Sequence, residues 1–304
     1  MKGLVMKSTG SWYEVVGDDQ KHYACRTKGK LRLEGSKETN PVAVGDRVTF
    51  ELEGNNGVIS EILPRRNHML RQSVKKTGQS SVLAANVDQV VLIATTKLPR
   101  TSRGFIDRFL ISAESFRIPQ VLIFNKTDLL SPEEKNEQET LLLLYNRLGV
   151  HTMAISALQD DLLFLNQILS KKVTLMAGHS GVGKSTILNR LSPDILQTIG
   201  KISEFSNKGI HTTTFAEMFQ LSENTFIVDT PGVKEWGLVD MDQQEISDYF
   251  PEMRDLRLHC KFGSRCLHIN EPKCAIIDAV QKEEIARSRY ESYLSMVMGG
   301  DNRK

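Results

Sequence analysis

The order of two short motifs constrains the fold of this chain more than any other feature of its sequence. Residues 178–185 match the pattern G-x-x-x-x-G-K-[ST], which wraps phosphate groups where it joins a strand to a helix. The tetrapeptide Asn125-Lys126-Thr127-Asp128, of the kind that binds a guanine base, comes before it. In an ordinary guanine-nucleotide domain the phosphate loop comes first. If the two loops meet in space, the domain is therefore circularly permuted.

The region from about residue 87 to 230 alternates apolar runs with helical stretches, which is typical of a parallel sheet covered by helices. Such sheets bind ligands beyond the carboxyl ends of their strands, so loops far apart in sequence can gather at one edge. Buried strands are predicted at Gln89–Thr95, Gln120–Phe124, His151–Ile155, Val173–Ala177 and Thr225–Val228, and helices at Arg103–Phe116, Pro132–Leu148 and Lys184–Leu191.

The phosphate loop carries the groups that hold a nucleotide triphosphate. Its glycines let backbone N–H groups turn toward phosphate, Lys184 brings positive charge to the β- and γ-phosphates, and the Ser185 hydroxyl can bind Mg²⁺. Lys184 is therefore also a candidate catalytic residue. The predicted nucleotide-binding residues here are Gly178, His179, Ser180, Gly181, Val182, Gly183, Lys184, Ser185 and Thr186.

The tetrapeptide and a second, later loop predict recognition of guanine. The Asp128 carboxylate can accept hydrogen bonds from guanine N1–H and the N2 amine, and adenine offers neither donor in that arrangement. Lys126 can lie along the base, and a backbone N–H of Ser156 or Ala157 can face guanine O6. The predicted base-binding residues are Asn125, Lys126, Thr127, Asp128, Ser156 and Ala157.

Residues that respond to the γ-phosphate are predicted in two segments. Asp229, at a strand end, can hold Mg²⁺ through water, and the Gly232 N–H can face the γ-phosphate. Within Ile210–Thr214, Thr213 is favoured as the threonine that closes over Mg²⁺, although the neighbouring threonines remain alternatives.

The group that orients the attacking water is not obvious. Val233 follows Gly232 where many GTPases carry a glutamine, and valine forms no hydrogen bond through its side chain. Hydrolysis should then be slow or depend on another residue. His211 is a candidate catalytic residue for this role, and a solvent-facing loop histidine is the alternative interpretation.

Three cysteines and a histidine near the C-terminus predict one structural zinc site. A Cys₃His set with closed tetrahedral coordination can fold a segment too small for its own core. The predicted ligands are Cys260, Cys266, His268 and Cys274.

Residues 1 to about 70 read as short strands, for which an OB-like β-barrel is preferred over other compact β modules. Net charge is only +2 over 304 residues, so any RNA contact must rest on local patches. One candidate patch lies within residues 21–37 and includes Tyr23; a solvated surface is the alternative. Its cations are Lys21, Arg26, Lys28, Lys30, Arg32 and Lys37, and those of a second patch are Arg254, Arg257, Lys261, Arg265 and Lys273.

No apolar run in the sequence is long enough to span a bilayer, so no membrane association is expected. A cytoplasmic location and a monomeric state are the default expectations.

Together these motifs resemble the family of circularly permuted, ribosome small-subunit-dependent GTPases called RsgA or YjeQ. The resemblance implies an α/β P-loop GTPase with three domains: an OB-fold at residues 1–70, the permuted GTPase at 71–236 and a zinc-binding, mainly helical domain at 237–304. His211 sits at the position of that family's proposed catalytic histidine, and Val233 matches its replacement of the glutamine. Five residues separate Cys260 from Cys266, where four are expected.

The resemblance also implies GTP hydrolysis to GDP during late assembly of the 30S ribosomal subunit, with contacts to 16S rRNA and stimulation by the subunit. Because the segment after Gly232 leads into the zinc domain, nucleotide state is expected to change the orientation of that domain.

Two other functions remain open from the residues alone. A small-molecule kinase would also use a phosphate loop, but Asp128 argues against it because a kinase needs no carboxylate that reads guanine. An RNA-binding module that holds nucleotide without hydrolysing it is compatible with Val233.

Overall fold

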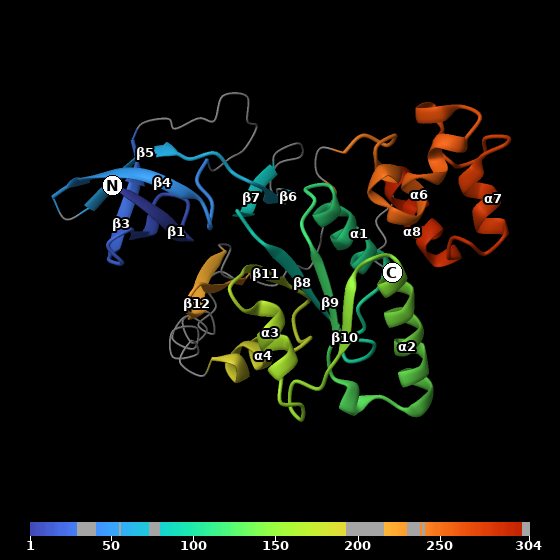
Figure 1. Cartoon of the computed structure of the whole chain (residues 1–304), viewed down its shortest axis with the longest axis horizontal. Coiled ribbons are helices and arrows are strands. Elements are labelled where there is room, and N and C mark those ends of the chain that lie inside the picture. Colours follow the sequence, from blue (N-terminus) through green and yellow to red (C-terminus); the bar gives the residue numbers. More distant parts are fainter. Residues whose placement is uncertain are drawn as a thin grey trace.

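The computed structural model describes residues 1–28, 41–54, 56–72, 80–192, 216–229, 238 and 241–299. A barrel, a parallel sheet with its helices and a helical module lie side by side along the longest axis, with the sheet between the other two (Figure 1). One eleven-stranded sheet runs continuously from the barrel into the parallel sheet, in the order β10-β9-β8-β11-β13-β12-β1-β2-β3-β5-β4.

The N-terminal strands form a closed, OB-like five-stranded barrel, because β1 pairs with both β2 and β4. Alternate side chains such as Val5, Val15, Phe50 and Ile59 point inward and are fully buried. This alternation is what places one face of each strand in a core. The strands are β1 (Lys2–Ser8), β2 (Tyr13–Gly17), β3 (His22–Thr27), β4 (Arg47–Glu53) and β5 (Asn56–Ile62).

The parallel sheet consists of strands in the order β10-β9-β8-β11-β13, as the alternating pattern predicted. Its strands are β8 (Gln89–Ala94), β9 (Gln120–Phe124), β10 (His151–Ala154), β11 (Val173–Ala177) and β13 (Thr225–Asp229). One prediction was wrong: β10 is not a buried strand but the sheet edge, where His151 and Ala154 are exposed.

Helices cover both faces of this sheet. On β8, Val90 and Leu92 pack under α1 (Arg103–Glu114) and α2 (Pro132–Arg147), whereas Val91 and Ile93 pack under α3 (Leu163–Leu169) and α4 (Lys184–Leu191). The start of α2 is defined by a capping box in which the Ser131 side chain accepts from Glu134 N–H and Glu134 reciprocates. A short 3₁₀ turn, η1 (Thr127–Leu129), follows β9.

Two additional strand pairs join the barrel to the sheet. A hairpin of β6 (His68–Gln72) and β7 (Ser80–Ala85) follows the barrel. Strand β12 (Glu217–Ser222) runs antiparallel to β13 and meets β1 at one residue pair, Lys7 with Glu217, whose side chains also form a 3.0 Å ion pair.

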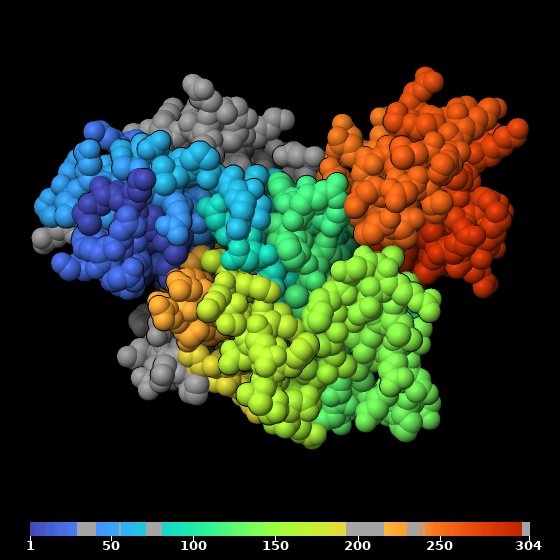
Figure 2. Space-filling view, in the orientation of Figure 1, coloured from blue at the N-terminus to red at the C-terminus, as the bar shows by residue number. Residues whose placement is uncertain are grey.

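The C-terminal module is helical and packs against α1 (Figures 1 and 2). The predicted helical tail Ile276–Met298 is divided in two by residues 282–286. Its elements are η2 (Ile246–Tyr249), α6 (Pro251–Arg254), η3 (Leu256–His259), η4 (Gly263–Arg265), α7 (Ala275–Gln281) and α8 (Arg287–Val297). Among the described residues, every helix is too short or too polar to cross a bilayer.

Candidate nucleotide site and metal centre

The phosphate loop joins β11 to α4 at the carboxyl edge of the sheet. Gly183 directly precedes α4 with φ +98°, and a Cβ at this position would lie 2.3 Å from Asn125 Nδ2. Only glycine therefore fits here, for both its dihedral and its closeness to the neighbouring loop. The helix N-terminus behind it presents unpaired backbone N–H groups, the arrangement that suits a phosphate.

Lys184 lies inside the curve of this loop. Its Nζ donates hydrogen bonds to the carbonyl oxygens of Gly178 at 2.7 Å and of His179 at 3.3 Å. Burial lowers the pKa of the ammonium, and the Asp229 carboxylate acts in the opposite direction. Asp229 ends β13 and is the strand neighbour of Met176 on β11, so it lies on the same edge as the loop. The donor set of Ser185 and Asp229, a hydroxyl and a carboxylate, is of the kind Mg²⁺ prefers.

His179 faces away from the rest of the loop, toward α1. Its ring packs against Phe105 with centroids 4.0 Å apart, and burial followed by the charge of Lys184 lowers its pKa. Its side chain is thus a contact between the loop and α1, and its contribution to phosphate binding would come from the backbone.

Asn125 connects the three predicted nucleotide loops. Its Nδ2 donates to the Val182 carbonyl in the phosphate loop at 2.8 Å, and its Oδ1 accepts from the Ala157 N–H at 2.9 Å. The side chain is 2% exposed, so both bonds are shielded from water. Asn125 therefore holds together two residues that follow it by 57 and by 32 positions in the chain.

The residues after Asn125 face the same edge. Lys126 has φ +68° and donates from Nζ to the Leu98 carbonyl at 2.6 Å. Thr127 N–H donates to the Ile155 carbonyl at 3.2 Å, which brings Asp128 beside the Ser156 loop. Within the described part of the chain, the half-buried Asp128 carboxylate forms no hydrogen bond or ion pair.

Some of the predicted site residues fall in the stretches between the described ranges. Thr213, His211, Gly232 and Val233 lie outside the described residues, as do Lys30, Arg32 and Lys37 of the first basic patch.

The four predicted zinc ligands converge and are all buried. Their ligand atoms lie within 4.8 Å of one another. His268 Nδ1 is 3.3 Å from Cys274 Sγ and 3.5 Å from Cys260 Sγ, and these two sulfurs are 3.8 Å apart. Zn–S bonds of about 2.3 Å in a tetrahedron place two sulfurs about 3.8 Å apart, so the set fits one zinc ion. The turn η4 occupies the long gap between the first two cysteines.

Neighbouring groups fix the backbone around these ligands. The Glu271 carboxylate accepts from the N–H groups of Leu267, Ile269 and Asn270. From α8, Tyr290 donates to the His268 carbonyl at 2.7 Å, and Tyr293 donates to the Leu267 carbonyl at 2.8 Å. Such outer contacts orient metal ligands before a metal binds.

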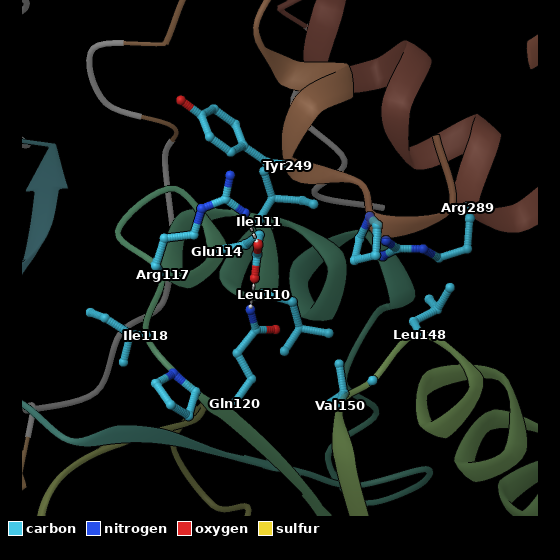
Figure 3. A pocket seen from close by; sticks show the side chains of 13 residues that line it. Leu110, Ile111, Glu114, Arg117, Ile118, Gln120, Leu148, Val150, Tyr249 and Arg289 are labelled. Carbon is cyan, nitrogen blue, oxygen red and sulfur yellow. Dashed lines mark hydrogen bonds and ion pairs between the residues drawn. The ribbon is translucent and has the colours of Figure 1, made fainter. Parts of the chain in front are cut away.

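A cavity of about 220 Å³ lies at the other edge of the sheet, between α1 and the C-terminal module. Figure 3 shows Glu114 beside Arg117 and Gln120, with Tyr249 and Arg289 on the module side. Gln120 begins β9 and Val150 directly precedes β10, so this cavity is at the amino ends of the strands. It belongs to the junction between the two units and not to the nucleotide loops.

Sequence reasoning missed several residues that hold the site together. Arg190 donates from Nη1 to the Ala157 carbonyl at 2.8 Å, and the Ser156 N–H donates to Asp160 Oδ2 at 2.7 Å. The acidic Asp160 so close to Ser156 was a signal for a local turn. Nothing in the sequence around Arg190 indicated its partner.

A phosphate loop on a parallel sheet whose strands follow one another in permuted order defines the class: a circularly permuted GTPase. A family model described as RsgA GTPase matches residues 62–239, and one described as RsgA N-terminal domain matches residues 2–59. The chain belongs to the RsgA GTPase family and hydrolyses GTP.

Relatives and solved structures agree over the full length. A small ribosomal subunit biogenesis GTPase RsgA from Christiangramia forsetii is 48% identical, covering 99% of this chain and 97% of the relative. One of the same name from Bacteroides fragilis is 47% identical, covering 98% and 96%. The crystal structure of YjeQ from Thermotoga maritima superposes with a TM-score of 0.76 at 32% identity over 100% of this chain and 99% of the other. That of YloQ, described as a circularly permuted GTPase, has a TM-score of 0.72 at 28% identity over 100% and 96%.

Proposed function

We propose that this chain is a late assembly factor of the small (30S) ribosomal subunit, which it binds through 16S rRNA and which stimulates its hydrolysis of GTP. The observation that carries the enzymatic part is the double hydrogen bond of Asn125, which holds the phosphate loop and the Ser156 loop together. The role in assembly rests on relatives named for it that match 96–97% of their own length.

Guanine is read by the loop that follows β9 and by the Ser156 loop. Asp128 accepts from the base, Lys126 lies along it, and Asn125, Thr127, Ser156 and Ala157 hold the pocket in shape. The residues from Gly178 to Thr186 bind the phosphates. An Asp128 carboxylate that has no partner among the described residues supports this assignment, because a base with two donors would satisfy it.

Hydrolysis depends on residues that close around the γ-phosphate. Mg²⁺, when bound, neutralises developing charge on the phosphates. This ion is held, directly or through water, by Ser185, Thr213 and Asp229. Lys184 stabilises the transferring group. The Gly232 N–H faces the γ-phosphate. His211 positions water in place of the glutamine that Val233 replaces. Because His211 lies outside the phosphate loop and must be brought into place, hydrolysis should depend on the 30S subunit.

The three units divide the work at residues 1–70, 71–236 and 237–304. RNA contacts are assigned to the barrel and to the zinc-binding unit. In the second patch, Arg254 and Arg257 are engaged in ion pairs with Glu114 and Asp248. The remaining three cations are exposed and are better placed for RNA, and the ammonium of one of them, Lys261, lies over the exposed ring of Phe262. They are Lys261, Arg265 and Lys273.

Nucleotide state is coupled to the zinc-binding unit through the segment after Asp229. Only eight residues separate Asp229 from Leu238, which packs with Met241 against the core of the C-terminal module. Helix α1 offers a second connection, because Phe105 contacts His179 of the phosphate loop and Asp107 pairs with Arg289 of α8. One structural zinc holds the unit together. The protein acts as a monomer in the cytoplasm, where ribosomes assemble.

A GTPase assay with and without purified 30S subunits tests this proposal. Phosphate release that rises severalfold or more with 30S, and not with 50S, is the expected result. Phosphate transfer to a small-molecule acceptor would instead identify a kinase. Tight GTP binding with no phosphate release in either condition would identify a nucleotide-holding RNA-binding protein.

A further inference from the structure

Arg190 connects the helix of the phosphate loop to the loop that reads the base. It lies on α4, two turns after Lys184, and its Nη1 donates to the carbonyl oxygen of Ala157 at 2.8 Å. Both elements belong to the nucleotide site described above, but Arg190 bonds to the protein backbone and is not assigned a contact with the nucleotide itself. Its effect must therefore pass through the Ala157 carbonyl.

That carbonyl belongs to the same peptide group as the N–H of Leu158. In a trans peptide the C=O and N–H point in opposite directions and rotate together as one plane. An arginine that holds the carbonyl therefore also fixes the direction of the Leu158 N–H, away from α4. A charged donor on the carbonyl further polarises the peptide and makes its N–H a stronger donor.

The other N–H groups of this loop are already engaged. Ser156 N–H donates to Asp160 Oδ2 at 2.7 Å, and Ala157 N–H donates to Asn125 Oδ1 at 2.9 Å. Within the described residues, Leu158 N–H donates no hydrogen bond, and the Leu158 side chain is 73% exposed. Of these three consecutive amides, Leu158 carries the one that remains available to a ligand.

We propose that Arg190 is a positioning residue for base specificity, holding the 157–158 peptide so that the Leu158 N–H donates to the 6-oxo group of a purine nucleotide. The inference rests on the proposed guanine site and adds the donor and the side chain that orients it. Because α4 begins at the phosphate loop, the helix that binds phosphate also orients the group that reads O6.

The test compares GDP with 6-thio-GDP, which keeps N1–H and the N2 amine but carries a weak sulfur acceptor at position 6. For Arg190→Ala, GDP affinity is expected to fall about fivefold and 6-thio-GDP affinity to fall less. The ratio of GDP affinity to 6-thio-GDP affinity should therefore decrease. Arg190→Lys, which retains charged donors, should restore most of the ratio. Arg147→Ala, an exposed arginine on α2, is the matched control and should change neither affinity.

The Leu158 amide gives a second readout. With ¹⁵N-leucine labelling, its proton signal should move downfield on addition of GDP to the wild type and move less in Arg190→Ala. Equal losses for both nucleotides, or an unshifted Leu158 amide, would overturn the inference. Arg190 is largely exposed, so its replacement should leave the melting temperature nearly unchanged. If the wild type bound ATP as tightly as GTP, the proposed guanine site itself would fail, whatever Arg190 did.

Discussion

The sheet domain meets its two neighbours through junctions built in different ways. The barrel is attached mainly by backbone contacts: Ala85 N–H donates to the Val44 carbonyl at 2.8 Å, and Gly45 lies so close to Ala85 that a Cβ would be 2.1 Å from its carbonyl oxygen. Around this contact, Asn86 Nδ2 donates to the Gly45 carbonyl, and Arg65 pairs with the buried Asp46. Such close backbone packing allows one arrangement only.

Charged side chains tie the C-terminal module to α1, beside the apolar contact that Ile111 of α1 makes with the core of the module. Arg289 from α8 pairs with Asp107 of α1 at 2.5 Å and with Glu252 at 2.7 Å, and Tyr145 also donates to Asp107. Burial acts to lower the pKa of Arg289, but the two carboxylates outweigh it and raise the pKa above its ordinary value. A cavity of about 220 Å³ lies beside this network.

The difference indicates which unit can change orientation. Ion pairs beside a cavity can exchange partners between two discrete arrangements, whereas a backbone contact with no room for a methyl group cannot. If nucleotide state is coupled to the C-terminal module as proposed, the comparison predicts that the barrel keeps its orientation while that module changes its own.

Zinc removal should give the largest effect, and the loss of structure should be confined to the C-terminal module. A chelator, or Cys274→Ser, removes a metal-binding free energy on the order of 10 kcal/mol that folds the module. Hydrogen exchange is expected to rise across residues 241–299 while the barrel strands keep their protection. Loss of protection in β1–β5 on chelation would contradict the separation of the two junctions.

Replacing Arg289 should cost less but still several kcal/mol. Arg289→Ala leaves the buried Asp107 and the largely buried Glu252 without their arginine partner, for which about 3–5 kcal/mol is expected in urea unfolding. Arg287→Ala, on the same helix but exposed, removes only a surface pair with Glu291 and should cost less than about 0.5 kcal/mol. Similar losses for both variants would show that the buried network does not hold the junction.

A methyl group at Gly45 tests the barrel junction. Gly45→Ala forces a Cβ against the Ala85 carbonyl at φ +88° and should destabilise the protein by about 3 kcal/mol. Gly54→Ala is the matched control, because its φ is +63° but nothing lies within 4 Å of the added Cβ. Only the left-handed backbone conformation should then lower the free energy of unfolding, by about 1 kcal/mol. Equal unfolding midpoints for the two variants would mean that the close approach of Gly45 to Ala85 does not contribute to stability.

The smallest effect concerns His68, which packs on Phe116 between the hairpin and α1. Burial, together with the charge of Arg65, lowers its pKa, and Asp46 opposes this. Below about pH 6.5 the unfolded chain then binds more protons than the folded one. Stability should therefore fall as pH falls through this range, by at most ~1.4 kcal/mol per unit.

Urea unfolding of His68→Phe measures that contribution. The variant should show a shallower loss of stability between pH 6.5 and 5 than the wild type, whereas the exposed His151→Gln should follow the wild type. If the free energy of unfolding of His68→Phe depended on pH as that of the wild type does, His68 would not be the source of the pH dependence.

Much of the fold could be predicted because the central strands are apolar on both faces and end in recognisable loops. The other strands have no such pattern: β10, at the sheet edge, was wrongly predicted to be buried. Strand β12 lies between β13 and β1, and its mixed sequence was not recognised because its partners were unknown. Helix α3 was missed because it has only seven residues and leaves Leu163 and Phe164 exposed.

The site was predicted at the level of loops and not of their connections. Asn125 was recognised as part of a motif, but its bonds to residues 57 and 32 positions away depend on the tertiary fold. The same holds for Arg190 and for the Asp107–Arg289 pair, separated by 182 residues. The ion pairs that engage Arg254 and Arg257 of the second basic patch were likewise not predicted, since ion-pair partners cannot be read from composition.

The central claim is that loops in permuted order form a single guanine site in which Asp128 reads the base. Equilibrium binding of GDP and xanthosine diphosphate to the wild type and to Asp128→Asn tests it directly. Asn can donate to the 2-oxo group of xanthine, so the account predicts that the preference shifts toward xanthosine diphosphate by on the order of a hundredfold. An unchanged preference for GDP in the variant would contradict the account.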